Sequence, residues 1–283
     1  MGVELIAKTP GKTPQVRDIV QIVEELYPPR LAEEWDRVGL IAGRPDNPVT
    51  RLLVAVDPVP VVAAEALELG ANMVLTHHPL YLRGTSFVAA TDYKGTLIHD
   101  FIENRVALMN AHTNADAARR GVAEALAQAV GLANGVPFDP HEDGLGLGRI
   151  GELPKEVTAG ELAEKVAGVL NVGPEGVLLA GDPATVVRKL AVSGGAGDSF
   201  LERVKWLGAN AYVTADLRHH PASEHIEDAG PVLITASHFA TEWPWVPVAG
   251  RDIAESLVAA GLGAEVYIST TITEPWTRRI GAK

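Results

Sequence analysis

The sequence predicts an α/β protein made of two similar α/β halves with mostly parallel sheets, and three observations lead to this prediction. Short, wholly apolar runs alternate with helical patterns along most of the chain, which is typical of parallel strands joined by helices. The tetrapeptide Leu-Gly-Ala-Asn precedes an apolar run at 69–72 and again at 207–210. In each half, His-His-Pro, a second apolar run and a His-x-x-x-carboxylate unit follow.

In the first half, the predicted elements follow from apolar spacing and from Gly and Pro at their ends. A helix that begins after Thr13 and Pro14 is closed by Pro28 and Pro29, and Gly70 is the expected C-cap of a later helix. The predicted elements are a helix at 16–26, a strand at 52–56, a helix at 61–69, strands at 73–76 and 106–109, and helices at 95–104 and 117–130.

Residues 133–149 are rich in Gly, Pro and Asp, which indicates a linker between the halves. We therefore expect a first half at 1–135, a linker at 136–148 and a second half at 149–283. The elements expected in the second half are helices near 158–170, at 199–207 and at 251–260, and strands at 190–192, 211–214, 232–235 and 265–272.

Composition excludes several classes of protein. The net charge of −12 and the pI near 5.2 disfavour a nucleic-acid-binding surface, which needs clustered Lys and Arg. There are no cysteines, so disulfides and thiolate ligands are excluded. Neither a signal peptide nor an apolar run of membrane-spanning length is evident. We therefore expect a cytoplasmic protein without a membrane partner.

Most of the nine histidines lie directly after, or a few residues after, the predicted strands. The units are His77-His78-Pro79, His112 with Asp116, His219-His220-Pro221, and His238 with Glu242. Ligands gather at the carboxyl ends of parallel strands, so we expect a metal site in the cleft between the two halves. Imidazole and carboxylate donors without sulfur suit zinc, manganese, iron or nickel. Two such ions would generate a hydroxide near neutral pH and clamp a substrate oxygen.

Five stretches resemble the Ngg-interacting-factor-three-like family, whose members are often labelled GTP cyclohydrolase I type 2 homologues. They are Glu34–Leu40, Thr76–Leu80, His112–Asp116, Ser193–Ser199 and His238–Glu242. The stretches span most of the chain in the order found in the family, which makes the resemblance more specific than any single motif.

The resemblance implies a two-part α/β protein that assembles into a ring-shaped homohexamer with two divalent metal ions per chain. It also implies the metal ligands, with Glu242 as the bridging residue: His77, His78, Asp116, His238 and Glu242. Three positions depart from the family pattern, because Arg37 stands where Asn is common, Ser237 where Gly is usual and Phe239 where Tyr is frequent. Arg37 and Phe239 are expected to alter what the pocket accepts.

Some residues in these stretches have a second interpretation. We expect His112 to orient a ligand by a hydrogen bond rather than to bind metal directly. His219 and His220 either line the cleft or cap an exposed turn. The Gly-rich loop Ser193–Ser199 is expected to be a tight turn between a strand and a helix, rather than an anion-binding loop. Trp35 is expected in the core or at an interface rather than as a substrate platform.

The remaining residues are assigned supporting roles. Asp36 is a candidate for ordering the pocket. His99, His141 and His225 are expected to be structural, because they lie on predicted helices or in the linker.

The leading functional hypothesis is a metal-dependent hydrolase of a small phosphorylated or nucleotide-like substrate. His112 or His220 is the expected proton-transfer residue, since an imidazole titrates close to neutral pH. The alternative is a metal-binding, metal-delivery or scaffold protein without catalysis. The GTP cyclohydrolase I mechanism is not carried over, because those enzymes use cysteine ligands and this chain has none.

Overall fold

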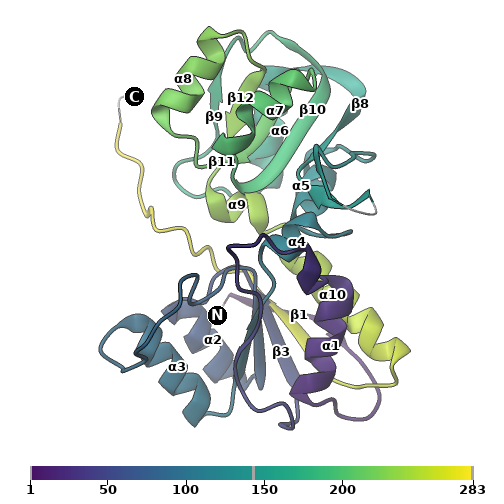
Figure 1. Ribbon diagram of the computed structural model, residues 1–283, viewed down its shortest axis with the longest axis vertical. Helices are drawn as coiled ribbons and strands as arrows, with labels where there is room; N and C mark the ends of the chain where they lie inside the picture. The colour runs from purple at the N-terminus through teal and green to yellow at the C-terminus, as the bar shows by residue number, and fades with distance from the viewer. Residues whose placement is uncertain (1, 142–143, 282–283) are drawn as a thin grey trace. The chain divides into compact units, whose positions relative to one another are not determined.

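The computed structural model describes residues 2–141 and 144–281, and the chain folds into two compact units (Figure 1). The first unit consists of Met1–Arg119 and Val246–Thr273, and the second of Arg120–Trp245 and Glu274–Lys283. The chain returns to the first unit near its C-terminus because its last strand, β13 (Glu265–Ser269), pairs with β1 and β3. This grouping differs from the predicted one, in which 149–283 formed the second half.

A six-stranded sheet in the order β1-β13-β3-β4-β5-β2 forms the centre of the first unit. Strands β13, β3, β4 and β5 are parallel to one another, whereas β1 and β2 pair antiparallel at the edges. The other strands are β1 (Val3–Lys8), β2 (Gly39–Ala42), β3 (Arg51–Ala55), β4 (Met73–Thr76) and β5 (Ala107–Asn110). The helices are α1 (Val16–Leu26), η1 (Pro29–Leu31), α2 (Pro60–Leu69), α3 (Tyr93–Glu103), α4 (Thr113–Ala117) and α10 (Trp245–Ala259).

The second unit has a five-stranded sheet in the order β8-β10-β11-β12-β9. Strands β10, β11 and β12 are parallel, and both edge strands pair antiparallel. The strands are β8 (Arg149–Thr158), β9 (Leu178–Ala180), β10 (Val186–Ala196), β11 (Ala211–Ala215) and β12 (Val232–Thr235), with β6 (Asp139–Pro140) and β7 (Gly146–Leu147) in a separate pair. The helices are α5 (Val122–Val130), α6 (Ala159–Val169), η3 (Asp198–Phe200), α7 (Leu201–Trp206), α8 (His219–Glu227) and α9 (His238–Glu242).

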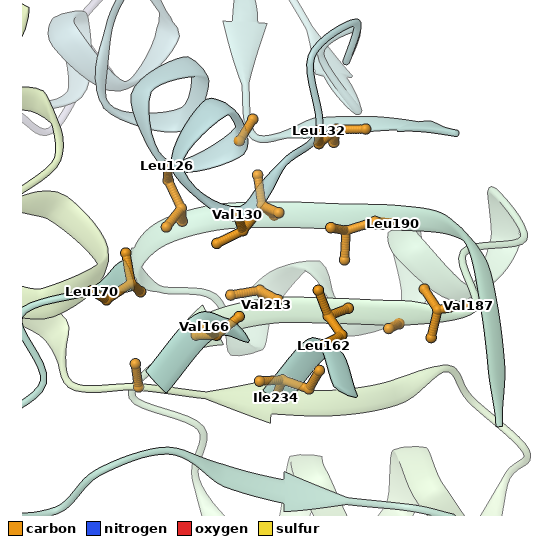
Figure 2. Close-up of a cluster of buried hydrophobic side chains, with 14 of the residues drawn as sticks. Leu126, Val130, Leu132, Leu162, Val166, Leu170, Val187, Leu190, Val213 and Ile234 are labelled. Atoms are coloured by element: carbon orange, nitrogen blue, oxygen red, sulfur yellow. The ribbon is translucent and has the colours of Figure 1, made fainter. Parts of the chain in front are cut away.

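Apolar side chains cover both faces of the sheet in the second unit. One cluster joins Leu126 of α5 and Leu162 of α6 to Val213 of β11 (Figure 2). The neighbouring residue Tyr212 belongs to another cluster, with Val204 of α7. Since successive residues of a strand point to opposite faces, the two clusters lie on opposite sides of the sheet. Burial on both faces explains why β11 reads as a continuous apolar run.

The repeated Leu-Gly-Ala-Asn motif has the same structure in both units. Gly70 and Gly208 follow the ends of α2 and α7 with φ of 66° and 71°, a left-handed conformation that favours glycine. The Asn72 side-chain oxygen accepts hydrogen bonds from the backbone of Thr50 at 2.8 Å and of Arg51 at 3.2 Å. Asn210 does the same for Arg188 and Lys189, at 3.1 and 2.8 Å. The motif therefore fixes β4 and β11 against the strands before them, β3 and β10.

The predicted fold class is confirmed, since both units are α/β with parallel strands at the centre of each sheet. Four edge strands, β1, β2, β8 and β9, were not predicted. The helix expected at 117–130 begins later, at Val122, as α5, and the short helix α4 (Thr113–Ala117) precedes it. Among the described residues, every helix is too short or too polar to span a membrane.

Candidate metal centre

The three first-unit histidines of the predicted motifs follow two neighbouring parallel strands. His77 and His78 come directly after β4, and His112 precedes α4, two residues after β5. One ring nitrogen from each of the three lies within 4.8 Å of the other two, close enough for a shared metal ion. The sheet therefore brings together residues that are far apart in the sequence, as expected at the carboxyl ends of parallel strands.

A protein oxygen holds the Nδ1 atom of each of these rings. His77 Nδ1 donates to the carbonyl oxygen of Ala111 at 2.9 Å. His78 Nδ1 lies 2.7 Å from Asp57 Oδ1, and His112 Nδ1 lies 3.0 Å from Asp36 Oδ1. Since a carbonyl or an ionised carboxylate only accepts, Nδ1 carries the proton, and in a neutral ring the lone pair is on Nε2. This arrangement orients metal-binding histidines in proteins.

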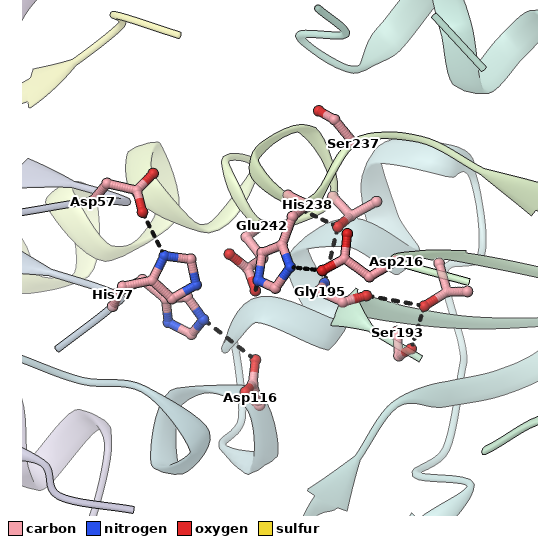
Figure 3. Close-up of polar contacts among 12 residues, drawn as sticks. Asp57, His77, Asp116, Ser193, Gly195, Asp216, Ser237, His238 and Glu242 are labelled. Atoms are coloured by element: carbon pink, nitrogen blue, oxygen red, sulfur yellow. Dashed lines mark hydrogen bonds and ion pairs between the residues drawn. The ribbon is translucent and has the colours of Figure 1, made fainter. Parts of the chain in front are cut away.

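Asp116 lies on the turn of helix that follows His112. Its Oδ1 is 3.7 Å from Nε2 of His77, the atom that carries the lone pair in the neutral ring (Figure 3). The predicted ligands of the first unit, His77, His78 and Asp116, are therefore close together, and His112 lies among them. The donor set contains only nitrogen and oxygen, which fits a divalent transition metal.

Asp36 is the buried residue that fixes His112. Its Oδ2 accepts from the Thr113 backbone at 3.0 Å and from the Thr113 hydroxyl at 2.6 Å, and its Oδ1 accepts from the Arg37 backbone at 2.7 Å. Burial alone would raise the pKa of this carboxyl, but the bonds from His112 and Thr113 outweigh burial and hold the pKa well below its usual value. Asp36 is thus a charged anchor, in line with its expected role in ordering the pocket.

In the second unit, His238 and Glu242 form a pair on one face of α9. His238 Nε2 lies 2.9 Å from Glu242 Oε1, at the i and i+4 spacing that places side chains together on a helix. His238 Nδ1 lies 2.7 Å from Asp216 Oδ2, so this ring too is held by an acceptor (Figure 3). Burial lowers the pKa of His238, but Glu242 and Asp216 outweigh burial and raise that pKa to about 11. A cation that replaced the proton on Nε2 would meet the Glu242 carboxylate, while Asp216 still held Nδ1.

The Gly-rich stretch Ser193–Ser199 forms the end of β10 and the start of η3, and it lies against this pair. Gly195 has a φ of +64°, and a Cβ atom there would lie 2.5 Å from Glu242 Oε1 and 3.1 Å from His238 Nε2. Its N–H donates to the Thr241 hydroxyl at 2.9 Å. The prediction of a tight turn is wrong for Ser193–Ala196, which belong to β10. Their register against β11 is irregular, and this end of β10 packs against α9 before η3 begins at Asp198. Only a residue without a side chain fits this position without displacing the carboxylate.

Buried hydroxyl groups hydrogen-bond to this end of β10. Ser193 Oγ lies 2.6 Å from the Tyr212 hydroxyl and 3.0 Å from Thr214 Oγ1, which donates to the Gly195 carbonyl at 3.2 Å. Burial raises the pKa of Tyr212 to about 12. The tyrosine therefore stays protonated where an exposed one would ionise.

We expect this tyrosine to make the protein sensitive to alkali. A pKa raised from 10.0 to about 12 gives stability that is present below pH 10 and lost as the pH rises to 12. The loss is on the order of 2 to 3 kcal/mol of unfolding free energy. Urea unfolding of the wild type and of Tyr212→Phe at pH 8 to 11.5 tests this. The phenylalanine variant is expected to be less stable at pH 8 and to lose less unfolding free energy as the pH rises. An equal fall of unfolding free energy with pH in both proteins would contradict this prediction.

The other histidines lie elsewhere. His219 and His220 are exposed at the start of α8, with ring centroids 5.1 Å apart. Neither belongs to a cluster of candidate metal ligands within the described part of the chain. His225 is buried, with Nε2 3.1 Å from the Pro231 carbonyl oxygen, and His99 Nε2 lies 3.1 Å from that of Val88. These two contacts fit the structural roles expected for His99 and His225.

Two residues of the centre were missed in the sequence. Asp57 and Asp216, which hold His78 and His238, follow the buried apolar runs that end β3 and β11. That position after a strand is the signal that could have identified them, as it did for the histidines. A pocket of about 210 Å³ adjoins His238 and Asp216 and is also lined by Glu175, Glu274 and Trp276.

The fold and the histidine clusters define a class of two-unit α/β proteins with candidate nitrogen and oxygen metal ligands. Residues 14–275 match the model of the Duf34/NIF3 (NGG1p interacting factor 3) family, and the chain belongs to this family. It is 45% identical over 275 residues to a protein of Streptomyces coelicolor named GTP cyclohydrolase 1 type 2 homolog, covering 95% of this chain and 96% of that protein.

Two solved structures have the same fold as this chain. A Staphylococcus aureus hypothetical protein superposes with a TM-score of 0.89 at 25% identity, over 95% of this chain and 100% of that one. A Bacillus cereus protein related to NIF3 has a TM-score of 0.87 at 25% identity, over 94% of this chain and 99% of that one.

Proposed function

We propose that this protein binds two divalent metal ions per chain through His77, His78, Asp116, His238 and Glu242. The observation that carries the proposal is that each of the three histidines has its Nδ1 held by a carbonyl or carboxylate oxygen. Histidines with purely structural roles have no reason to share this pattern, in which Nδ1 is held in all three rings. The family resemblance supplies Glu242 as the bridging ligand.

We further propose that the protein is a hydrolase of a small phosphorylated or nucleotide-like substrate. Bound divalent ions would polarise a phosphoryl or carbonyl oxygen and lower the pKa of water. His112 is the first candidate for proton transfer, because Asp36 fixes its ring beside His77 and His78. His220 is the second candidate, on the exposed start of α8. The relatives' name suggests GTP as one substrate to test. We also propose a cytoplasmic homohexamer, as the family resemblance implies.

The proposal predicts about two ions per chain in protein purified without chelators. The His78→Ala, Glu242→Ala double variant should retain fewer than one ion, because Glu242 is the proposed bridge between the two ions and His78 is a further ligand. Mass spectrometry of intact protein and elemental analysis measure both. A matched control, His99→Ala with Glu152→Ala, removes an exposed histidine and an exposed glutamate outside both clusters and should bind as the wild type.

The same preparations decide whether the protein is a catalyst. Hydrolysis of GTP or of a phosphodiester that needs the ions and falls with His112→Ala would support the hydrolase. Two exchangeable ions without hydrolysis would favour the alternative, a metal-binding or metal-delivery protein. Absence of stoichiometric metal, even after zinc or manganese is added, would overturn the whole proposal.

A further inference from the structure

Trp35 is a large aromatic side chain that lies in solvent beside the first-unit histidines. It is 56% exposed, which excludes the core from the two expected positions, the core and an interface. Its ring centroid is 6.0 Å from that of His112, and the two rings are nearly perpendicular, at 79°. The exposed ring is thus next to the residue that lies among the candidate metal ligands.

The loop that carries Trp35 is held on both sides by hydrogen bonds. The Glu33 backbone donates to the Thr113 hydroxyl at 2.9 Å, and the Asp36 backbone donates to the Glu33 carbonyl at 2.9 Å. The Asp36 side chain, in turn, binds His112 and Thr113. A tryptophan kept exposed on such a loop adds little to folding, because its apolar surface stays in water. It is, however, already positioned for a ligand, which lowers the entropic cost of binding.

Arg37 adds a positive charge to the same loop. Its side chain is exposed, and its Nη1 donates to the carbonyl oxygens of Glu34 at 3.1 Å and Asp36 at 2.5 Å. These bonds fix the guanidinium on the protein surface instead of leaving it on a mobile stem. A fixed guanidinium suits phosphate and carboxylate groups, and it offers a local positive charge in a chain of net charge −12.

We propose that the loop Glu33–Val38 recognises the substrate. Trp35 stacks on a flat heteroaromatic ring, and Arg37 binds an anionic group of the same molecule. The ligand class is therefore a phosphorylated heteroaromatic compound, such as a nucleotide. This inference rests on the proposed function, since the metal ligands beside His112 are what give the loop a substrate. Stacking does not select among bases, because every base has a π face.

The test is isothermal titration calorimetry of the full chain with manganese, using guanosine monophosphate and ribose 5-phosphate as probes. The wild type should bind the nucleotide about tenfold more tightly than the sugar phosphate. Trp35→Ala should abolish most of that difference, and Trp35→Phe should keep part of it. Arg37→Ala should weaken both probes to the same degree. The control, Trp206→Ala, removes a tryptophan that is 78% exposed in the second unit and should have no effect.

Three results would overturn the inference. The wild type could bind neither probe or show no preference for the nucleotide. Trp35→Ala could bind both probes as the wild type does. Trp35→Ala could change the molar mass measured by light scattering, which would place Trp35 at an interface between copies of the chain. Metal content is measured on every sample, so a Trp35-dependent nucleotide preference without bound ions would overturn the proposed function and leave this inference standing.

Discussion

Replacing Gly195 with alanine is expected to abolish metal binding by the His238 and Glu242 pair while leaving the protein folded. The added Cβ would lie 2.5 Å from Glu242 Oε1, so the carboxylate must move and its 2.9 Å contact with His238 is lost. Glu242 is buried, and its new position would have to be found within a closely packed interior. The expected result is loss of about one ion per chain or more, since Glu242 is the proposed bridging ligand.

Gly208→Ala is the matched control for this substitution. Gly208 has a similar φ of +71°, but a Cβ atom there meets no atom within 4 Å. Both variants therefore carry the cost of a left-handed alanine, roughly 1 kcal/mol. Only Gly195→Ala also places a Cβ atom against Glu242. Urea unfolding and elemental analysis of both variants separate the two effects. Equal metal content in the two variants would show that the end of β10 does not position Glu242.

The central strands and the histidines at their ends could be predicted because each carries a strong local signal. Strands β4 and β5 are buried along their whole length, so they read as apolar runs. His77 and His78 follow directly, where ligands gather in parallel sheets. The edge strands gave no such signal: β1 is half-exposed and mixes polar with apolar residues. Its pairing with β13 joins residues near opposite ends of the chain, which local periodicity does not encode.

The second His-His-Pro unit does not occupy the same structural position as the first, although the sequence pattern is repeated. Strand β11 extends to Ala215, and Asp216 occupies the position directly after it. His219 and His220 come later and begin α8. The residue that acts at the end of β11 is therefore Asp216, which holds His238. A single aspartate after a strand is too common for its partner to be identified without the fold, and the same holds for Asp57.

Asp36→Asn is expected to destabilise the first unit and to release His112. Both Asp36 oxygens accept hydrogen bonds, from His112 and Arg37 on Oδ1 and from Thr113 on Oδ2. An asparagine of the same shape replaces one oxygen with a donor, so the backbone N–H of either Arg37 or Thr113 loses its acceptor, depending on which way the amide lies. Leaving this backbone N–H unsatisfied costs about 1 to 3 kcal/mol in unfolding free energy. Urea unfolding measures this loss.

Asp92→Asn is the control, because Asp92 caps α3 at its N-terminus through a 2.8 Å bond to the Gly95 backbone, where aspartate and asparagine serve equally well. It should change stability by less than about 0.5 kcal/mol. The state of His112 is read from its ring nitrogens by NMR. In the wild type the proton is on Nδ1, facing Asp36. If the NH2 group of the asparagine faces the ring, the variant should lose this tautomer. If the amide oxygen faces the ring, the tautomer stays and Thr113 loses its acceptor instead. Wild-type stability in Asp36→Asn would mean that the carboxylate is not the anchor of this loop, and that His112 owes its orientation to packing against His77 and His78.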